Sequence, residues 1–172
     1  MTDFKPDLGH NSGHMKDLIK HALLEKVDLE LKGLEVAAQT TKDYVQDGDL
    51  KSDGKYDTRG IEAGYLAGAQ MKRIEELKLE RQMLEEIPLR EFSATDDIGI
   101  GALVDIELNA ITRKYFLATT AGGTMLNING QGILVISVFS PIGDAIVDQR
   151  VGDEFELETP QGKRSYTIVS VS

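Results

Sequence analysis

The sequence contains no cysteine and no tryptophan, and aromatic residues make up only 6% of the chain. The lack of cysteine excludes disulfide bonds, thiolate metal sites and cysteine nucleophiles. No apolar run approaches the ~20 residues that a membrane-spanning helix needs. These absences fit a protein of the reducing cytoplasm that makes no contact with a membrane, and this is the location we expect.

The N-terminal segment, residues 1–14, is polar and contains glycine, and it lacks the basic and apolar regions of a signal peptide. We expect it to form a disordered tail. His10, His14 and His21 lie in or near this segment without a carboxylate cluster beside them, which favours incidental surface histidines over a metal site. Because all three histidines are N-terminal, the serines of the C-terminal half have no local histidine, and a nucleophilic triad is not credible.

The charge of the chain limits its partners. Twenty-nine acidic residues stand against 19 basic ones, which gives a net charge of −10. Affinity for duplex DNA comes largely from lysine and arginine that neutralise phosphates, so direct binding to duplex DNA is disfavoured. A basic protein surface, a bound cation or a positively charged channel is a better partner.

The first half of the chain has helical periodicity. Mostly apolar residues recur at spacings of three and four in two runs: Leu23, Val27, Leu31, Leu34, Ala38, Thr41 and Val45, and then Ala63, Ala67, Gln70, Ile74, Leu77, Arg81 and Leu84. Gln70 and Arg81 interrupt the second run. Residues 46–55, rich in Asp, Gly and Ser, form a turn between them. Two long helices joined by a short loop run antiparallel, so the sequence predicts a coiled-coil hairpin over residues 15–88 that projects roughly 45 Å.

Gly60, Gly64 and Gly68 are spaced four apart within the second predicted helix. Glycine costs ~1 kcal/mol against alanine in a helix interior, so a compensating reason is expected. Close approach of the facing helix is the reason that we favour. A deliberately soft segment near the end of the hairpin is the alternative.

The composition changes near Pro88, where Leu, Glu and Lys give way to Gly, Thr, Val and Ile. After an expected linker at residues 89–97, residues 98–172 contain about five strand-like segments and a short helix after Pro141. The strand candidates are 103–108, 114–119, 133–139, 154–158 and 165–171. The sequence therefore predicts an α+β protein, in which a two-helix hairpin precedes a compact β-rich domain.

Five aspartates fall within residues 43–57, at the expected end of the hairpin: Asp43, Asp47, Asp49, Asp53 and Asp57. A solvated turn explains them in the simplest way, because Asp and Gly are good turn residues. Their gathering far from the folded body also fits Mg²⁺, a hard cation that takes one or two protein carboxylates and keeps several waters. A calcium loop is rejected, since the required glycine and the bidentate glutamate are missing.

Two sets of motifs resemble the bacterial Gre-type (GreA/GreB) transcript cleavage factors. Near the tip, Gly48-Asp49-Leu50-Lys51 precedes Tyr56 and Gly64-Tyr65-x-x-Gly68. In the C-terminal half the matching segments are Ser140-Pro141-Ile142-Gly143-x-Ala145-Ile146-Val147, Val151-Gly152-Asp153-Glu154, Pro160-x-Gly162 and Tyr166-x-Ile168. The similarity spans roughly residues 18–171, and the order of the two sets makes it fairly specific.

The resemblance implies an FKBP-like C-terminal domain and a partner, bacterial RNA polymerase. Such factors bind near the secondary channel, with Ser140, Pro141 and Ile142 as the docking segment here, and insert the hairpin. Tip carboxylates then help the polymerase hold a second Mg²⁺, and backtracked RNA is cleaved near its 3′ end. By this resemblance Asp49 and Asp53 are the Mg²⁺-directed residues, and the protein is a monomeric cofactor of the polymerase and not itself an enzyme.

Several departures from the family pattern leave alternatives open. Ser52 stands where the family has a second acidic residue, with Asp53 displaced by one, and a hydroxyl cannot replace a carboxylate at a metal. A regulator that occupies the channel without promoting cleavage is therefore the main alternative, and a structural coiled-coil adaptor is another. Near the docking segment, Asp144 and Asp148 replace usual basic residues, and Pro141 could simply terminate a strand.

Overall fold

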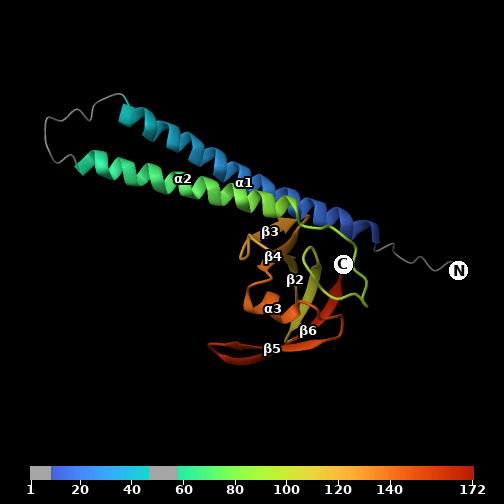
Figure 1. Cartoon of the computed structure of the whole chain (residues 1–172). Coiled ribbons are helices and arrows are strands. Elements are labelled where there is room, and N and C mark those ends of the chain that lie inside the picture. The colour runs from blue at the N-terminus through green and yellow to red at the C-terminus, as the bar shows by residue number, and fades with distance from the viewer. Residues whose placement is uncertain (1–8, 47–57) are drawn as a thin grey trace. The chain divides into compact units, whose positions relative to one another are not determined.

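The computed structural model describes residues 9–46 and 58–172, with side chains from Gly13 to Asp43 and from Ile61 onward (Figure 1). The chain divides into two compact units. Unit 1 contains Met1–Leu23 and Met83–Ser172, and unit 2 contains Leu24–Gln82. In the described part, no helix is both long enough and apolar enough to cross a membrane.

Unit 2 is the body of the predicted hairpin. It is built from parts of α1 (Gly9–Gln46) and α2 (Thr58–Glu85), which lie side by side (Figure 1). Val27, Ile74 and Leu77 are buried along the predicted apolar seam, which confirms the helical pattern. Beyond them toward the connection between the helices, the described seam residues are only half-buried. The hairpin core is therefore well packed over only part of its length.

The N-terminal segment differs from the expectation. α1 begins at Gly9, so residues 9–14 are helical and do not belong to a disordered tail. The reason lies just downstream, where Met15 and Ile19 are buried and anchor the helix in unit 1. Because α-helical backbone bonds are formed within the segment itself, the helix can extend upstream of this anchor through a polar sequence.

Two lysines of α1 satisfy backbone carbonyls at and after the end of α2. Lys20 donates from Nζ to the carbonyl oxygens of Glu85 and Ile87, at 2.6 and 3.2 Å. Lys16 donates from Nζ to the carbonyl oxygen of Arg90 at 2.7 Å. The last carbonyls of a helix have no partner within it and carry partial negative charge, so the Lys20 ammonium group is well placed at Glu85, the last residue of α2.

Phe92 lies in the expected linker, yet it is a buried member of the core of unit 1. Lys16 Nζ and Arg90 Cζ lie 4.9 and 4.0 Å from the centroid of its ring. The Lys16 side chain is fully buried, and burial lowers the pKa of its amine to about 8, against the opposing charge of Glu91. Residues 89–97 thus include part of a packed structure as well as a connection.

The rest of unit 1 is a six-stranded sheet in the order β3-β4-β2-β1-β6-β5. Five neighbouring pairs make up this sheet, and all are antiparallel except β2 with β4. The strands are β1 (Leu103–Leu108), β2 (Ile111–Ala118), β3 (Met125–Ile128), β4 (Gln131–Ser137), β5 (Glu154–Thr159) and β6 (Gly162–Val171). The α+β prediction is confirmed, and the one strand without a counterpart in the sequence analysis is the four-residue β3.

A short helix, α3 (Pro141–Ile146), contacts β4 and β5 (Figure 1). Ile146 is fully buried in one cluster with Val104, Tyr115 and Ile168 from the central strands. These strand residues lie on one face of the sheet by the register of β1 with its neighbours. The core of this part of unit 1 therefore lies between α3 and that face of the sheet. The short helix predicted after Pro141 is confirmed.

Candidate functional site

The predicted Mg²⁺-directed residues Asp49 and Asp53 lie outside the described residues, between Gln46 at the end of α1 and Thr58 at the start of α2. Of the five clustered aspartates, Asp43 is described. It is exposed and accepts a hydrogen bond of 2.6 Å from Gln39 Nε2, one turn earlier in α1. Within the described ranges, no group of three or more His, Asp or Glu side chains is arranged to hold a metal ion.

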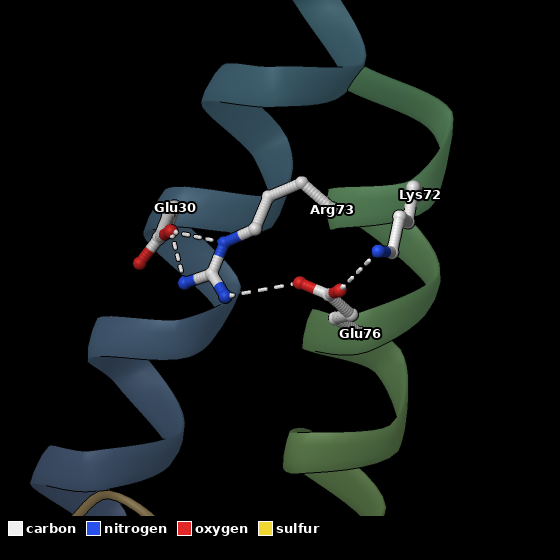
Figure 2. A network of polar contacts seen from close by, with 4 residues as sticks. All are labelled: Glu30, Lys72, Arg73 and Glu76. Carbon is white, nitrogen blue, oxygen red and sulfur yellow. Dashed lines mark hydrogen bonds and ion pairs between the residues drawn. The ribbon is translucent and has the colours of Figure 1, made fainter. Parts of the chain in front are cut away.

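A network of charged residues fixes the two helices of unit 2 against each other (Figure 2). Arg73 on α2 contacts Glu30 on α1, with Nη2 and Nε lying 2.7 and 3.1 Å from Oε1. Its other terminal nitrogen, Nη1, is 3.6 Å from Glu76, which also lies 3.9 Å from Lys72. The hydrogen bond to Glu30 raises the pKa of Arg73, so the guanidinium remains charged throughout.

A second ion pair joins the same helices farther from their connection, with Arg81 Nε 2.6 Å from Asp28 Oδ1. Arg81 interrupts the apolar run read from the sequence, and the structure gives it this polar role. Two pairs along an antiparallel hairpin allow only one alignment of α1 against α2 at full pairing. They therefore favour this alignment of the two helices.

The glycines of α2 do not mark close helix contact. A Cβ atom built at Gly64 or at Gly68 meets nothing within 4 Å, so close approach of the facing helix is wrong for these two positions. Gly64 instead borders a cavity of about 620 Å³ between the helices, together with Ala38, Ala67 and Met71. Small residues on both sides leave a space that larger side chains do not fill. A weakly packed, softer segment is the interpretation that remains.

The predicted docking segment begins α3. Ser140 is the N-cap residue: its Oγ accepts a hydrogen bond from Gly143 N at 3.1 Å and donates one to the Ser137 carbonyl at 2.7 Å. Pro141 occupies the first turn, where a missing N–H costs nothing, and its side chain is exposed. Ile142 packs against the core cluster. Ser140 and Ile142 thus have structural roles, and Pro141 presents its ring to solvent.

The structure adds Phe139 to this surface, a residue that the sequence analysis assigned to a strand. Strand β4 ends at Ser137, and the Phe139 side chain is 81% exposed. An aromatic ring immediately before an exposed proline forms an apolar spot, and Asp144 lies exposed close by in α3. The sequence feature that could have indicated this exposed aromatic residue is its position between the end of a strand and the serine that caps the next helix.

Comparisons with known proteins agree with both halves of the chain. Residues 93–172 match the family model described as "Transcription elongation factor, GreA/GreB, C-term". Transcription elongation factor GreA of Francisella tularensis subsp. novicida is 30% identical over 124 residues, covering 72% of each chain. Transcription inhibitor protein Gfh1 of Thermus thermophilus is 27% identical over 152 residues, covering 87% of this chain and 90% of the relative.

A crystal structure of Thermus aquaticus Gfh1 covers 88% of this chain and 94% of its own length, with 25% sequence identity and a TM-score of 0.38. At that score the superposition adds nothing to the sequence matches. The assignment of the chain therefore depends on sequence, and it includes residues of α1 and α2 as well as of the sheet.

Proposed function

Because this chain belongs to the GreA/GreB family of transcription elongation factors, we propose that it binds bacterial RNA polymerase and stimulates cleavage of backtracked RNA. The family implies RNA polymerase as the partner. In this proposal the protein acts as a monomer in the cytoplasm. The polymerase carries out the hydrolysis, so the protein is its cofactor and not a free-standing enzyme.

The proposed mechanism divides the work between the two halves. The surface at Ser140, Pro141 and Ile142, together with Phe139, docks on the polymerase. The hairpin enters the secondary channel, and Asp49 and Asp53 help to hold a second Mg²⁺ at the polymerase active site. Paired metal ions stabilise both the attacking and the leaving oxygen during phosphoryl transfer, which is why added carboxylates accelerate the reaction. RNA is contacted only at its 3′ end within the complex.

The observation that carries this proposal is where the tip motif falls. Gly48-Asp49-Leu50-Lys51 stands between the end of α1 and the start of α2, whose alignment is held by the Arg73–Glu30 contact. The C-terminal half matches the family model over residues 93–172 and follows the tip motif, which is the order that the resemblance to Gre-type factors implies. A structural adaptor has no need of either motif, so we set that alternative aside.

A second candidate function is supported by Ser52 and by the relatives named transcription inhibitor protein. If one carboxylate at the tip is too few to hold the ion, the same hairpin occupies the channel and slows the polymerase. This function differs from the first only in that the tip does not help the polymerase to hold a second Mg²⁺. Both need polymerase binding and the same surfaces.

The experiment adds the protein to a stalled, backtracked elongation complex and follows release of the RNA 3′ fragment. We expect release that is lost in Asp49→Ala and kept in Asp43→Ala, because Asp43 is paired with Gln39 within α1. Binding without release, with slower nucleotide addition, establishes the second candidate. Absence of any polymerase binding rejects both.

A further inference from the structure

A cavity of about 270 Å³ opens on the sheet of unit 1, and nothing in the proposed function uses it. It is lined by residues of β1, β2 and β6 and of the β1–β2 turn: Ile106, Leu108, Asn109, Ile111, Arg113, Tyr115, Arg164 and Tyr166. Two of these residues are cationic and none is acidic. The lining is therefore positively charged, although the chain as a whole has a net charge of −10.

Strand alternation explains how the lining is assembled. Ile106 is opposite Arg113 and Leu108 is opposite Ile111, so these side chains share one face of the sheet. Tyr166 and Arg164 follow the same alternation on β6. This is the face that α3 covers at its other end, through Val104 and Ile168. The cavity is the uncovered continuation of a buried surface.

The nearest carboxylates in sequence lie on the opposite face. Glu107 falls between Ile106 and Leu108 on β1, and Glu156 and Glu158 alternate with Leu157 on β5. Across the described residues, no ion pair joins Arg113 or Arg164 to a carboxylate, whereas Lys163 pairs with Glu156. The two guanidinium groups are therefore not neutralised by the protein itself.

The lining is held in position by contacts of its own. Arg164 Nη2 donates a hydrogen bond to Gln161 Oε1, which orients the guanidinium. The Tyr166 ring stacks on Phe155 with centroids 5.2 Å apart and an angle of 10° between planes. Burial raises the pKa of Tyr115, although the charge of Arg113 opposes this, so its hydroxyl stays protonated and able to donate at neutral pH.

We propose that this cavity is an oxyanion site, in which Arg113 and Arg164 bind a phosphate or carboxylate group and the two tyrosines form its walls. Guanidinium groups match both kinds of oxyanion through paired, charge-assisted hydrogen bonds. The apolar side chains of Ile106 and Leu108 keep the site partly shielded from water, which strengthens such contacts. The acidic residues elsewhere in the chain repel a bound anion only weakly, because exposed charges more than about 8 Å away are screened at physiological salt.

The test titrates the full chain with inorganic phosphate, and separately with acetate, at constant ionic strength and neutral pH. Amide and arginine Nε–H resonances are followed by NMR. We expect saturable shifts confined to the residues that line the cavity. Saturation by phosphate alone assigns a phosphate site and saturation by acetate as well assigns a general oxyanion site, and either result supports the proposal.

Matched variants separate this site from general attraction of anions. Arg113→Gln and Arg164→Gln each weaken binding about tenfold, which corresponds to loss of one charge-assisted hydrogen bond. Arg113→Lys keeps the positive charge but lacks the planar pair of N–H donors of a guanidinium, so it should bind more tightly than Arg113→Gln and less tightly than the unchanged protein. Arg150→Gln, in an exposed arginine paired with Asp97 at 2.7 Å, leaves binding unchanged.

The proposal is overturned if the shifts do not saturate, if they spread over the surface, or if Arg150→Gln weakens binding as much as the cavity variants do. Amide spectra that keep their native dispersion show that each variant is folded. This test does not involve polymerase, so its outcome is independent of the proposed function.

Discussion

Arg73 on α2 donates two hydrogen bonds to a single oxygen of Glu30 on α1, and this contact bridges the two helices of unit 2. Both side chains are 44% exposed, so water and salt weaken the attraction between them. The contact therefore contributes little to the free energy of unfolding, and its main effect is to favour one alignment of α1 against α2. An arginine that also faces Glu76 in its own helix has one favourable position, and a shifted hairpin loses it.

We expect Arg73→Gln to lower the melting temperature of the hairpin by only about 1–2 °C at low salt, and by less at high salt, because a half-exposed pair is screened. Thermal melts followed by circular dichroism at two salt concentrations measure this. Combining Arg73→Gln with Glu30→Gln should cost less than the sum of the single changes. Strict additivity would show that the contact contributes nothing to stability.

The buried amine of Lys16 predicts a pH dependence of stability. Below pH ~8 the amine is charged in both states, and the burial penalty is fully present. As pH rises from about 8 toward 10, the folded state loses this proton before the unfolded state does, so the unfolding free energy rises by up to about 3 kcal/mol. Above that window the gain from Lys16 ends, because the unfolded amine has then lost its proton too. Burial raises the pKa of Tyr115, so at still higher pH this residue lowers the unfolding free energy.

Urea unfolding at a series of pH values measures this rise. Lys16→Met should abolish most of the pH dependence, because an apolar side chain has no proton to lose. Lys20→Met should retain it, since the Lys16 amine remains buried. An equal rise in Lys16→Met would assign the effect to another group.

Gly64→Ala and Gly68→Ala should each stabilise the hairpin by about 1 kcal/mol, because the added methyl group meets nothing and alanine favours the helix. Denaturant unfolding followed by helical circular dichroism gives the value. Ala69→Gly, at an exposed position of the same helix, is the matched control and should destabilise by a similar amount. If Gly64→Ala destabilised the hairpin, the facing helix would have to lie close to this position, contrary to the structure.

Gly143→Ala should destabilise unit 1 by about 3 kcal/mol, since overpacking against backbone cannot be relieved by a rotamer change. A Cβ at this position would lie 1.9 Å from the Ser137 carbonyl oxygen. Equilibrium unfolding monitored by tyrosine signals reports the loss. Gly132→Ala, where a Cβ meets nothing within 4 Å, should change stability far less.

Ser52→Asp tests whether the tip lacks a carboxylate. If the first proposed function holds and Ser52 weakens it, the substitution should increase the rate of RNA 3′-fragment release about tenfold or more, since a second carboxylate improves retention of the ion. Ser52→Asn, which keeps the size without the charge, is the control. An equal gain in both variants would mean that shape and not charge limits the reaction.

The hairpin was readable from sequence because apolar spacing reports directly on a helix face, as Val27, Ile74 and Leu77 show. The pairing of Lys16 with a carbonyl 74 residues away was not readable, since no local pattern encodes such a contact. β3 was missed because four residues between turn signals are too few for an alternating pattern. The spacing of Gly64 and Gly68 predicted close helix contact wrongly, because spacing within one helix carries no information on the distance to the other.

The candidate site was predictable only in part. Ser140, Pro141 and Ile142 were found as a motif, but the cap formed by Ser140 and the exposure of Phe139 depend on where β4 ends. The cavity with Arg113 and Arg164 was not anticipated, because it unites strands that are distant in sequence. Strand pairing supplies this information, and periodicity within one strand does not.

The discontinuity of unit 1 has a consequence for the order of events during synthesis. Its residues come from Met1–Leu23 and from Met83–Ser172, so a ribosome must deliver all of Leu24–Gln82 before Ile19 and Leu23 meet the remainder of their unit. Until then these apolar side chains are not covered by the residues from Met83 onward that belong to the same unit. The segment around Ile19 and Leu23 is thus made well before the residues that complete its unit.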